Sequence, residues 1–170
     1  AANGLVWGLD NWLHNSWYEG QIRVRPGRFE YRYTETAGQW GLSFDDFGRL
    51  FRNNNAHPLR VDYLSAHYWA RNRGLTRTTG RWEEVTPNGP VWPARDNRGV
   101  TFGYSDREIR PDGTLAQFTA ASAPTAYRGD RLPAELRNNV FVTEPGGNLV
   151  RRYLITEGED GWLGAENSYD

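Results

Sequence analysis

The sequence predicts an all-β fold, and three observations support this prediction. Short runs rich in β-branched and aromatic residues, of which residues 140–142 are the clearest, alternate with turn residues along most of the chain. The 19 glycines and 9 prolines are scattered, as expected where many short strands need many turns. One strand-turn-strand pattern also occurs twice, which indicates a repeated unit. We therefore expect strands throughout and only short helices, near residues 63–70 and 133–137.

The N-terminal region predicts a meander of short strands. Apolar runs on both sides of Asp10-Asn11 predict a hairpin, because this dipeptide favours a tight turn. Two runs of alternating residues then flank Pro26-Gly27, which predicts a second hairpin.

The repeated pattern follows this meander. Residues 41–51 repeat residues 4–14 position for position, with Gly48 on Asn11 at the turn. A repeat offset of 37 residues, carrying about four strands, is the spacing of β-propeller blades. Residues 138–141 resemble a third, weaker copy of the turn and the strand that follows it.

The repeat predicts one domain of about three blade-like units with a long loop insertion. Residues 5–17 and 42–53 are then equivalent strand pairs of successive blades. The insertion is expected where three prolines interrupt a stretch without sustained periodicity, and loops of this length in a compact domain usually have a function. The expected units are residues 1–37, 38–64 and 101–170, with the insertion at 65–100.

Composition excludes several classes of function. The formal net charge is -1, and no basic stretch alternates with aromatic residues, so we expect no nucleic-acid partner. No apolar run is long enough to span a membrane. Cysteine is absent and the three histidines lack ligand spacing, so we expect no thiolate chemistry and no metal site built on histidine or cysteine.

Polar residues gather around a hairpin predicted within residues 122–153. Arg128, Asn148, Arg151 and Arg152 are the most notable of them, and arginine suits an anionic, planar ligand because its guanidinium binds in a bidentate way. Arg151 and Arg152 are adjacent in a predicted strand, so they point to opposite faces and only one can line a given cleft. The alternative is that these residues are turn formers and solvated charges.

We expect Gln39 and His57 to face the same cleft as Arg128 and one of the two adjacent arginines. Gln39, Arg128, Asn148 and Arg151 are therefore the candidate cofactor-binding residues. His57, in an Asn-rich loop, is a weak candidate for a catalytic base and otherwise faces water. His14 is a second weak candidate, although packing is the leading interpretation because Phe51 occupies its position in the repeat.

Several motifs then point to a known family. They are Gly4-Leu5-Val6-Trp7-Gly8-Leu9-Asp10-Asn11-Trp12-Leu13, Gln39-Trp40-Gly41-Leu42-Ser43-Phe44-Asp45-Asp46-Phe47-Gly48-Arg49-Leu50-Phe51, Val91-Trp92-Pro93, Tyr127-Arg128-Gly129-Asp130-Arg131-Leu132-Pro133, Asn139-Val140-Phe141-Val142 and Asn148-Leu149-Val150-Arg151-Arg152. With these motifs the chain resembles the pyrroloquinoline-quinone-dependent glucose/sorbosone dehydrogenase-like propellers. It resembles more closely their large relatives in the membrane-bound dehydrogenase group.

The resemblance implies a six-bladed propeller that oxidises a sugar or polyol with pyrroloquinoline quinone and calcium, in the periplasm or outside the cell. It assigns the family's catalytic histidine to no residue of this chain. The chain is too short for six such blades, so we expect an interior segment of about three, completed by self-association or by a partner chain. The alternative functions are a non-catalytic segment that binds carbohydrate or protein, and a structural piece of a larger assembly.

Overall fold

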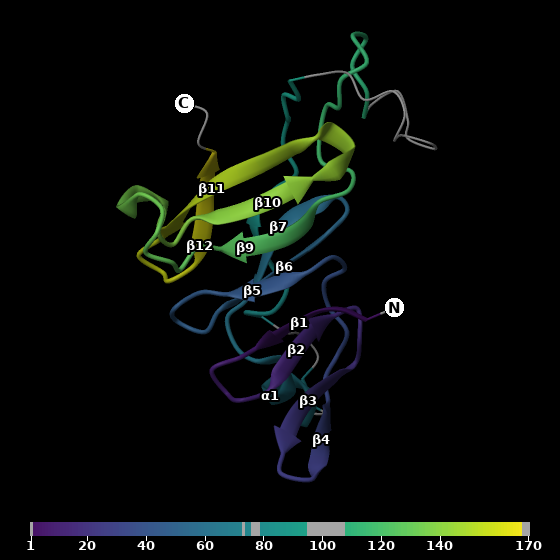
Figure 1. The fold of residues 1–170 in the computed structure, drawn as a ribbon, viewed down its shortest axis with the longest axis vertical. Coiled ribbons are helices and arrows are strands. Elements are labelled where there is room, and N and C mark those ends of the chain that lie inside the picture. Colours follow the sequence, from purple (N-terminus) through teal and green to yellow (C-terminus); the bar gives the residue numbers. More distant parts are fainter. Residues whose placement is uncertain (1, 73, 76–78, 95–107, 168–170) are drawn as a thin grey trace.

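The computed structural model describes residues 2–72, 74–75, 79–94 and 108–167, and the all-β prediction is confirmed for them. They form three antiparallel sheets of four strands each (Figure 1). The first sheet consists of β1 (Asn3–Trp7), β2 (Leu13–Ser16), β3 (Gly20–Arg25) and β4 (Arg28–Tyr33). The second consists of β5 (Leu42–Phe44), β6 (Leu50–Asn54), β7 (His57–Asp62) and β8 (Glu83–Thr86). The third consists of β9 (Ser122–Ala126), β10 (Val140–Glu144), β11 (Leu149–Glu157) and β12 (Leu163–Asn167).

The helices in the described residues are all short, and both predicted helices are present. The α-helix α1 (Ala66–Arg71) lies between β7 and β8, and the 3₁₀ turn η1 (Ala134–Leu136) precedes β10. A second 3₁₀ turn, η2 (Pro145–Gly147), connects β10 to β11. None of the described helices is long and apolar enough to cross a membrane.

The sequence repeat is also a structural repeat, because equivalent residues pair in the same register. Val6 pairs with His14 in the first sheet, and Ser43 pairs with Phe51 in the second. In the third sheet Phe141, in the weaker copy, pairs with Thr125. The two predicted strand pairs are therefore equivalent pairs of successive sheets.

The turns of the three copies share a conformation. Asn11, Gly48 and Asn138 precede the second strand of their sheets by two residues and have φ of 60°, 80° and 63°. This left-handed region is open to Gly and tolerated by Asn, which explains why these residue types recur at the turn.

The insertion expected at residues 65–100 needs correction. It contains β8, which pairs with β7 and completes the second sheet, so this sheet extends beyond the expected boundary at residue 64. The prediction missed β8 because its sequence, Glu-Glu-Val-Thr, has one strongly strand-forming apolar residue and gains stability from pairing with β7. Residues 95–107 of the expected insertion lie outside the described residues.

The sheets follow one another along the long axis of the molecule, with the first at one end and the third at the other (Figure 1). Each sheet is a meander in which the strands adjoin in sequence order. Strand β5 contacts both β1 and β9, so the first strands of the three sheets are neighbours. The larger hydrophobic core lies between the second and third sheets, and a smaller cluster of Leu42, Phe44 and Leu50 packs against Val6 of the first sheet.

Candidate functional site

A pocket with a volume of about 510 Å³ lies where the connection between the first two sheets crosses the second sheet. Two tryptophans, an arginine and an asparagine are the largest side chains in its wall. We call it the tryptophan pocket, and it is lined by Trp17, Thr36, Ala37, Gly38, Asn54, Arg81 and Trp82.

Both tryptophans of the pocket wall have a strained backbone. Trp17 has a φ of 58° and Trp82 a φ of 55°, in the left-handed region that bulky residues rarely adopt. Such outliers persist only where the surrounding structure holds them, and they gather at ligand sites. Their occurrence together in one pocket makes this pocket the leading site.

The polar surroundings fix Trp82 in place. Its backbone N–H donates to Oδ1 of the buried Asp62 at 2.8 Å, and its carbonyl accepts from Nη1 of Arg60 at 3.1 Å. The guanidinium of Arg60 also lies 5.7 Å from the centre of the Trp82 ring. The ring is therefore positioned before any ligand binds.

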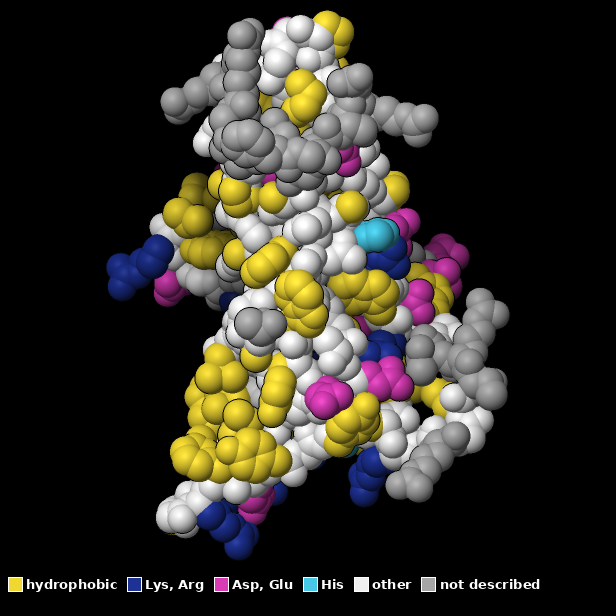
Figure 2. Space-filling view, turned by 90° about the vertical axis from the view of Figure 1, so that its right-hand side faces the viewer, with side chains coloured by type: hydrophobic (Ala, Val, Ile, Leu, Met, Phe, Trp, Pro, Cys, Tyr) yellow, Lys and Arg dark blue, Asp and Glu magenta, His cyan; other side chains and the backbone are white. Residues whose placement is uncertain are grey.

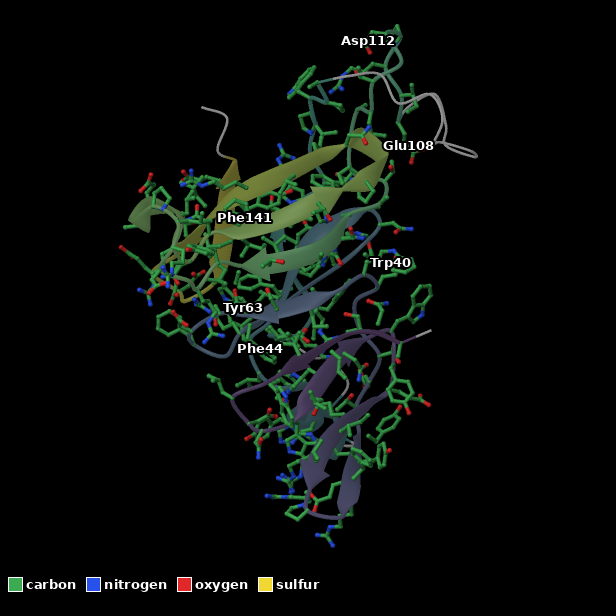
Figure 3. All side chains as sticks on the ribbon, in the orientation of Figure 1. Trp40, Phe44, Tyr63, Glu108, Asp112 and Phe141 are labelled. Carbon is green, nitrogen blue, oxygen red and sulfur yellow. The ribbon has the colours of Figure 1, made fainter. Side chains whose placement is uncertain are left out.

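A third tryptophan extends the aromatic surface. The ring of Trp40 meets that of Trp17 edge-on, with ring centroids 5.7 Å apart, and its indole N–H donates to Oδ1 of Asn55 at 2.6 Å. Trp17 is 44% exposed and Trp40 41% exposed, so both rings can contact a ligand. Figure 3 shows Trp40 at one end of the sheets, away from Phe44 and Tyr63.

Arginines anchor the backbone that forms the floor of the pocket. Arg52, which is 4% exposed, donates from Nη1 to the carbonyls of Ala37 at 2.7 Å and Asn15 at 3.0 Å. Its Nε lies 3.1 Å from Oδ2 of Asp62. Burial lowers the pKa of Arg52, and the charge of Asp62 opposes this effect. Arg81 pairs with Glu35 at the side of the pocket.

The structure brings two of the predicted residues next to this pocket. Asn54 lines it, and Oδ1 of Asn54 lies 2.8 Å from Nδ1 of His57. Oε1 of Gln39 accepts from the backbone N–H of Asn55 at 3.2 Å. Asn148 ends the 3₁₀ turn η2, whose Pro145 lines a neighbouring cavity of about 320 Å³ together with Trp40.

Arg128 and Arg151 do not join them, so the predicted common cleft is wrong. Arg128 follows the end of β9 and donates from Nε to Oδ1 of Asp46 at 2.6 Å. Asp46 follows the C-terminal end of β5, whereas Gln39 precedes its N-terminal end. Arg151 is 3% exposed and lies in the core, 5.8 Å from the ring centroid of Phe118. Proximity in the sequence could not reveal this separation, because strand direction decides at which end of the sheet a flanking residue lies.

Arg152 points to the other face of the third sheet from Arg151, as predicted for adjacent strand residues. Its Nε donates to Oδ1 of Asn139 at 2.8 Å. The four residues predicted to bind the quinone therefore do not converge and do not fit it as a set. Among the described residues, no group of three or more His, Asp or Glu side chains is arranged to hold a metal ion.

His14 belongs to a polar network on the first sheet. Its Nε2 lies 3.0 Å from Oδ1 of Asp10 and its Nδ1 lies 2.8 Å from Nε2 of Gln21, while Arg32 donates to both Gln21 and Asp10. Burial alone would raise the pKa of Asp10, but hydrogen bonds and charge from His14, with help from Arg32, hold this pKa well below its ordinary value. His14 is 1% exposed and contacts the ring of Phe44, which favours a packing role over catalysis.

A second cavity, of about 660 Å³, lies beside this network. The guanidiniums of Arg23 and Arg32 lie 4.5 and 4.2 Å from the centre of the Trp12 ring. These charges are already neutralised, since Arg23 pairs with Glu30 and Arg32 with Asp10. The cavity is therefore a weaker candidate than the tryptophan pocket, and it is lined by Trp12, Arg23, Arg32, Tyr33, His67, Ala70 and Arg71.

The sequence reasoning missed Trp17, Trp82 and Arg81. The abundance of tryptophan, with eight in the chain, was the available signal, and stacking surfaces for carbohydrate are a common reason for it. Which tryptophans meet at one pocket depends on contacts between residues more than 60 positions apart, which no local pattern encodes.

Comparison with known protein families finds a match over nearly the whole chain. Residues 1–168 match a family described as Domain of unknown function (DUF7133). No curated protein and no solved structure matches the chain.

Proposed function

The chain belongs to the DUF7133 family over residues 1–168, and for this member we propose a propeller-type module that binds a carbohydrate in the tryptophan pocket. The observation that carries the proposal is the pair of left-handed tryptophans, Trp17 and Trp82, in one pocket wall. Their strain has a purpose if the rings must be held in place for a ligand. A carbohydrate ligand fits a periplasmic or secreted location, which we include in the proposal.

The propeller arrangement has its own support. Four-stranded meanders follow one another along the chain, with equivalent pairing registers and with their first strands adjoining. This is how blades follow one another in a propeller, where the first strand of each blade lies nearest the axis.

The chemistry of the pocket suits a sugar. The exposed faces of Trp17 and Trp40 can stack against the C–H face of a sugar ring, as aromatic side chains do where large apolar contact must combine with polar recognition. Asn54 offers its amide N–H groups, and Arg81, whose charge is paired with Glu35, offers N–H groups beyond that ion pair for the hydroxyl or carboxylate oxygens of a sugar. We therefore propose neutral or acidic saccharides as the ligand class.

The test is a binding screen with a panel of neutral and acidic oligosaccharides, followed by calorimetry on the saccharides that bind. We expect Trp17→Ala and Trp40→Ala each to weaken binding roughly tenfold or more, as for aromatic side chains that become buried in a complex. Trp92→Ala is the matched control, because Trp92 is 68% exposed outside the pocket. Saccharide binding that is unchanged in both pocket variants, or no binding across the panel, would contradict the proposal.

A second candidate is quinone-dependent oxidation of a sugar or polyol, which would need a quinone site other than the four predicted residues, since these do not converge. One observation favours it: the amide of Asn54, in the pocket wall, orients the imidazole of His57, which could serve as a base. Incubation with pyrroloquinoline quinone and calcium, followed by dye reduction with the same saccharides, tests this candidate. Dye reduction that is lost in His57→Gln would support oxidation. Saccharide binding without dye reduction would contradict oxidation and leave carbohydrate binding as the proposed function.

A further inference from the structure

Each sheet has two faces that repeat in the same order along the chain. Equivalent first-strand residues, Trp7, Phe44 and Ala126, pair with Leu13, Leu50 and Val140, and we call the face that bears them the forward face. The opposite side is the rear face, and it bears the pairs Val6 with His14, Ser43 with Phe51, and Thr125 with Phe141.

The chain packs forward face on rear face at the first of its two internal junctions. The forward face of the second sheet covers the rear face of the first, with Phe44 edge-on to His14 at 4.9 Å between ring centroids. Val6 packs against Leu42 and Leu50 at the same junction.

The second junction repeats this arrangement. The forward face of the third sheet covers the rear face of the second, where Val140 and Ala126 share a core with Phe51. The backbone N–H of Ala126 also donates to Oγ of Ser43 at 2.9 Å. The packing mode is therefore a repeated property of these sheets.

The forward face of the first sheet has no such cover within the described residues. Trp7 is 52% exposed, whereas its equivalents Phe44 and Ala126 are each 8% exposed. Pairing within the sheet places four more apolar side chains on this face, at Val24, Phe29, Tyr31 and Tyr33. Figure 2 shows hydrophobic side chains gathered over the end of the molecule formed by the first sheet.

The rear face of the third sheet is open as well. Thr125 is exposed, and Phe141 is only half-buried, although its equivalents His14 and Phe51 are each 1% exposed. The chain thus has both halves of the contact that it makes twice internally, one at each end of its row of sheets (Figures 1 and 3).

We propose that the forward face of the first sheet binds the rear face of the third sheet of a second copy of this chain. We choose a second copy as the partner because the contact would repeat the packing of forward face on rear face that the chain already forms twice. The contact would also cover a large apolar patch. The contact is head-to-tail, and two copies that make it in both directions close into a two-fold dimer. The saccharide pocket lies elsewhere, so this inference is independent of the proposed function.

Sedimentation velocity over a range of protein concentrations tests the proposal. We expect reversible dimerisation, with a dissociation constant raised roughly tenfold or more by Tyr31→Lys or Phe29→Lys on the forward face, and by Thr125→Lys on the rear face. Phe47→Lys is the matched control, since Phe47 is 75% exposed in the turn between β5 and β6. Circular dichroism melting establishes that each variant is folded.

Mixing the variants identifies the geometry. A chain with Tyr31→Lys keeps an unchanged rear face, and a chain with Thr125→Lys keeps an unchanged forward face. The mixture should therefore form heterodimers with one intact contact, and these should be tighter than the homodimers of either variant. Association of the Thr125→Lys variant as tight as that of the unmodified chain would overturn the head-to-tail contact. An unmodified chain that stays monomeric at the highest concentration would overturn the proposal itself, whichever partner then covers the face.

Discussion

At the scale of single residues, the buried side chains of His14 and Gln21 belong to a hydrogen-bonded network that reaches the surface of the first sheet. Asp10, His14, Gln21 and Arg32 form a cycle of hydrogen bonds between the turn, β2, β3 and β4. Such a network rigidifies the sheet only if each member keeps its partner, because an unpaired buried group has a large desolvation penalty. The low pKa of Asp10 shows that the folded chain favours the ionised carboxylate.

Asp10→Asn should therefore destabilise the protein in a pH-dependent way. A carboxyl whose pKa is lower in the folded chain contributes stability above the unfolded pKa of about 3.9, and this contribution is lost as the pH falls. We expect a loss of about 1–2 kcal/mol in the free energy of unfolding at neutral pH, with a gap between variant and unmodified chain that narrows below about pH 4.

Urea unfolding between neutral pH and about pH 3 measures this gap. Asp130→Asn is the matched control, because the Asp130 side chain is 89% exposed and lies 3.7 Å from Arg131. A loss that stays constant across the pH range would mean that the substitution acts through packing and not through the charge.

At the scale of the strands, the start of β5 shows how closely the sheets approach one another. Gly41 has a φ of 87°, and a Cβ added there would lie 2.9 Å from Cα of Ala123 in the third sheet. Its equivalent Gly4 has a φ of 58°, and a Cβ there would lie 3.1 Å from Cα of Gly41. Equivalent residues of the three sheets therefore stack backbone against backbone.

Gly41→Ala should weaken the junction between the second and third sheets. The left-handed backbone costs about 1–2 kcal/mol for a residue with a Cβ, and the clash with the Ala123 backbone adds to it. Gly27→Ala is the control, since Gly27 has a φ of 75° but a Cβ there meets nothing within 4 Å. We expect Gly41→Ala to exceed Gly27→Ala by at least about 1 kcal/mol in urea unfolding; equal losses would show that backbone strain alone acts.

At the scale of the whole molecule, the two junctions between sheets differ in kind. The junction of the second and third sheets is a broad hydrophobic core, whereas three buried residues, Leu42, Phe44 and Leu50, form the cluster at the first junction. The buried pair of Arg52 and Asp62 supplements that cluster, because Arg52 also binds the carbonyls of Asn15 and Ala37. The first sheet thus depends on a polar clamp.

Arg52→Met should release the first sheet before the rest of the molecule unfolds. Loss of the arginine leaves the buried Asp62 carboxylate without its counter-ion, at a cost of about 3–5 kcal/mol. Hydrogen exchange should show faster opening of β1–β4 than of β9–β12. Arg128→Met is the control: it breaks an ion pair with Asp46 in which the Arg128 side chain is 44% exposed, so it should have little effect on exchange. Uniform acceleration of exchange across all three sheets would contradict a local clamp.

Much of the fold could be predicted from the sequence because the information is local. Alternation, turn residues and the offset between Gly4 and Gly41 fixed the all-β class and two equivalent strand pairs, since each depends on neighbours along the chain. Strand β8 escaped because its stability comes from pairing with β7.

The sequence by itself determined that this protein consists of repeated antiparallel strands with abundant aromatic residues. It did not determine the site, because Trp17, Asn54 and Trp82 come from three separate connections or strand ends. Only the tertiary structure decided that these residues meet and that Arg128 lies away from Gln39. The physical reason is that side-chain proximity across a junction depends on strand direction and sheet stacking, which are properties of the packed chain.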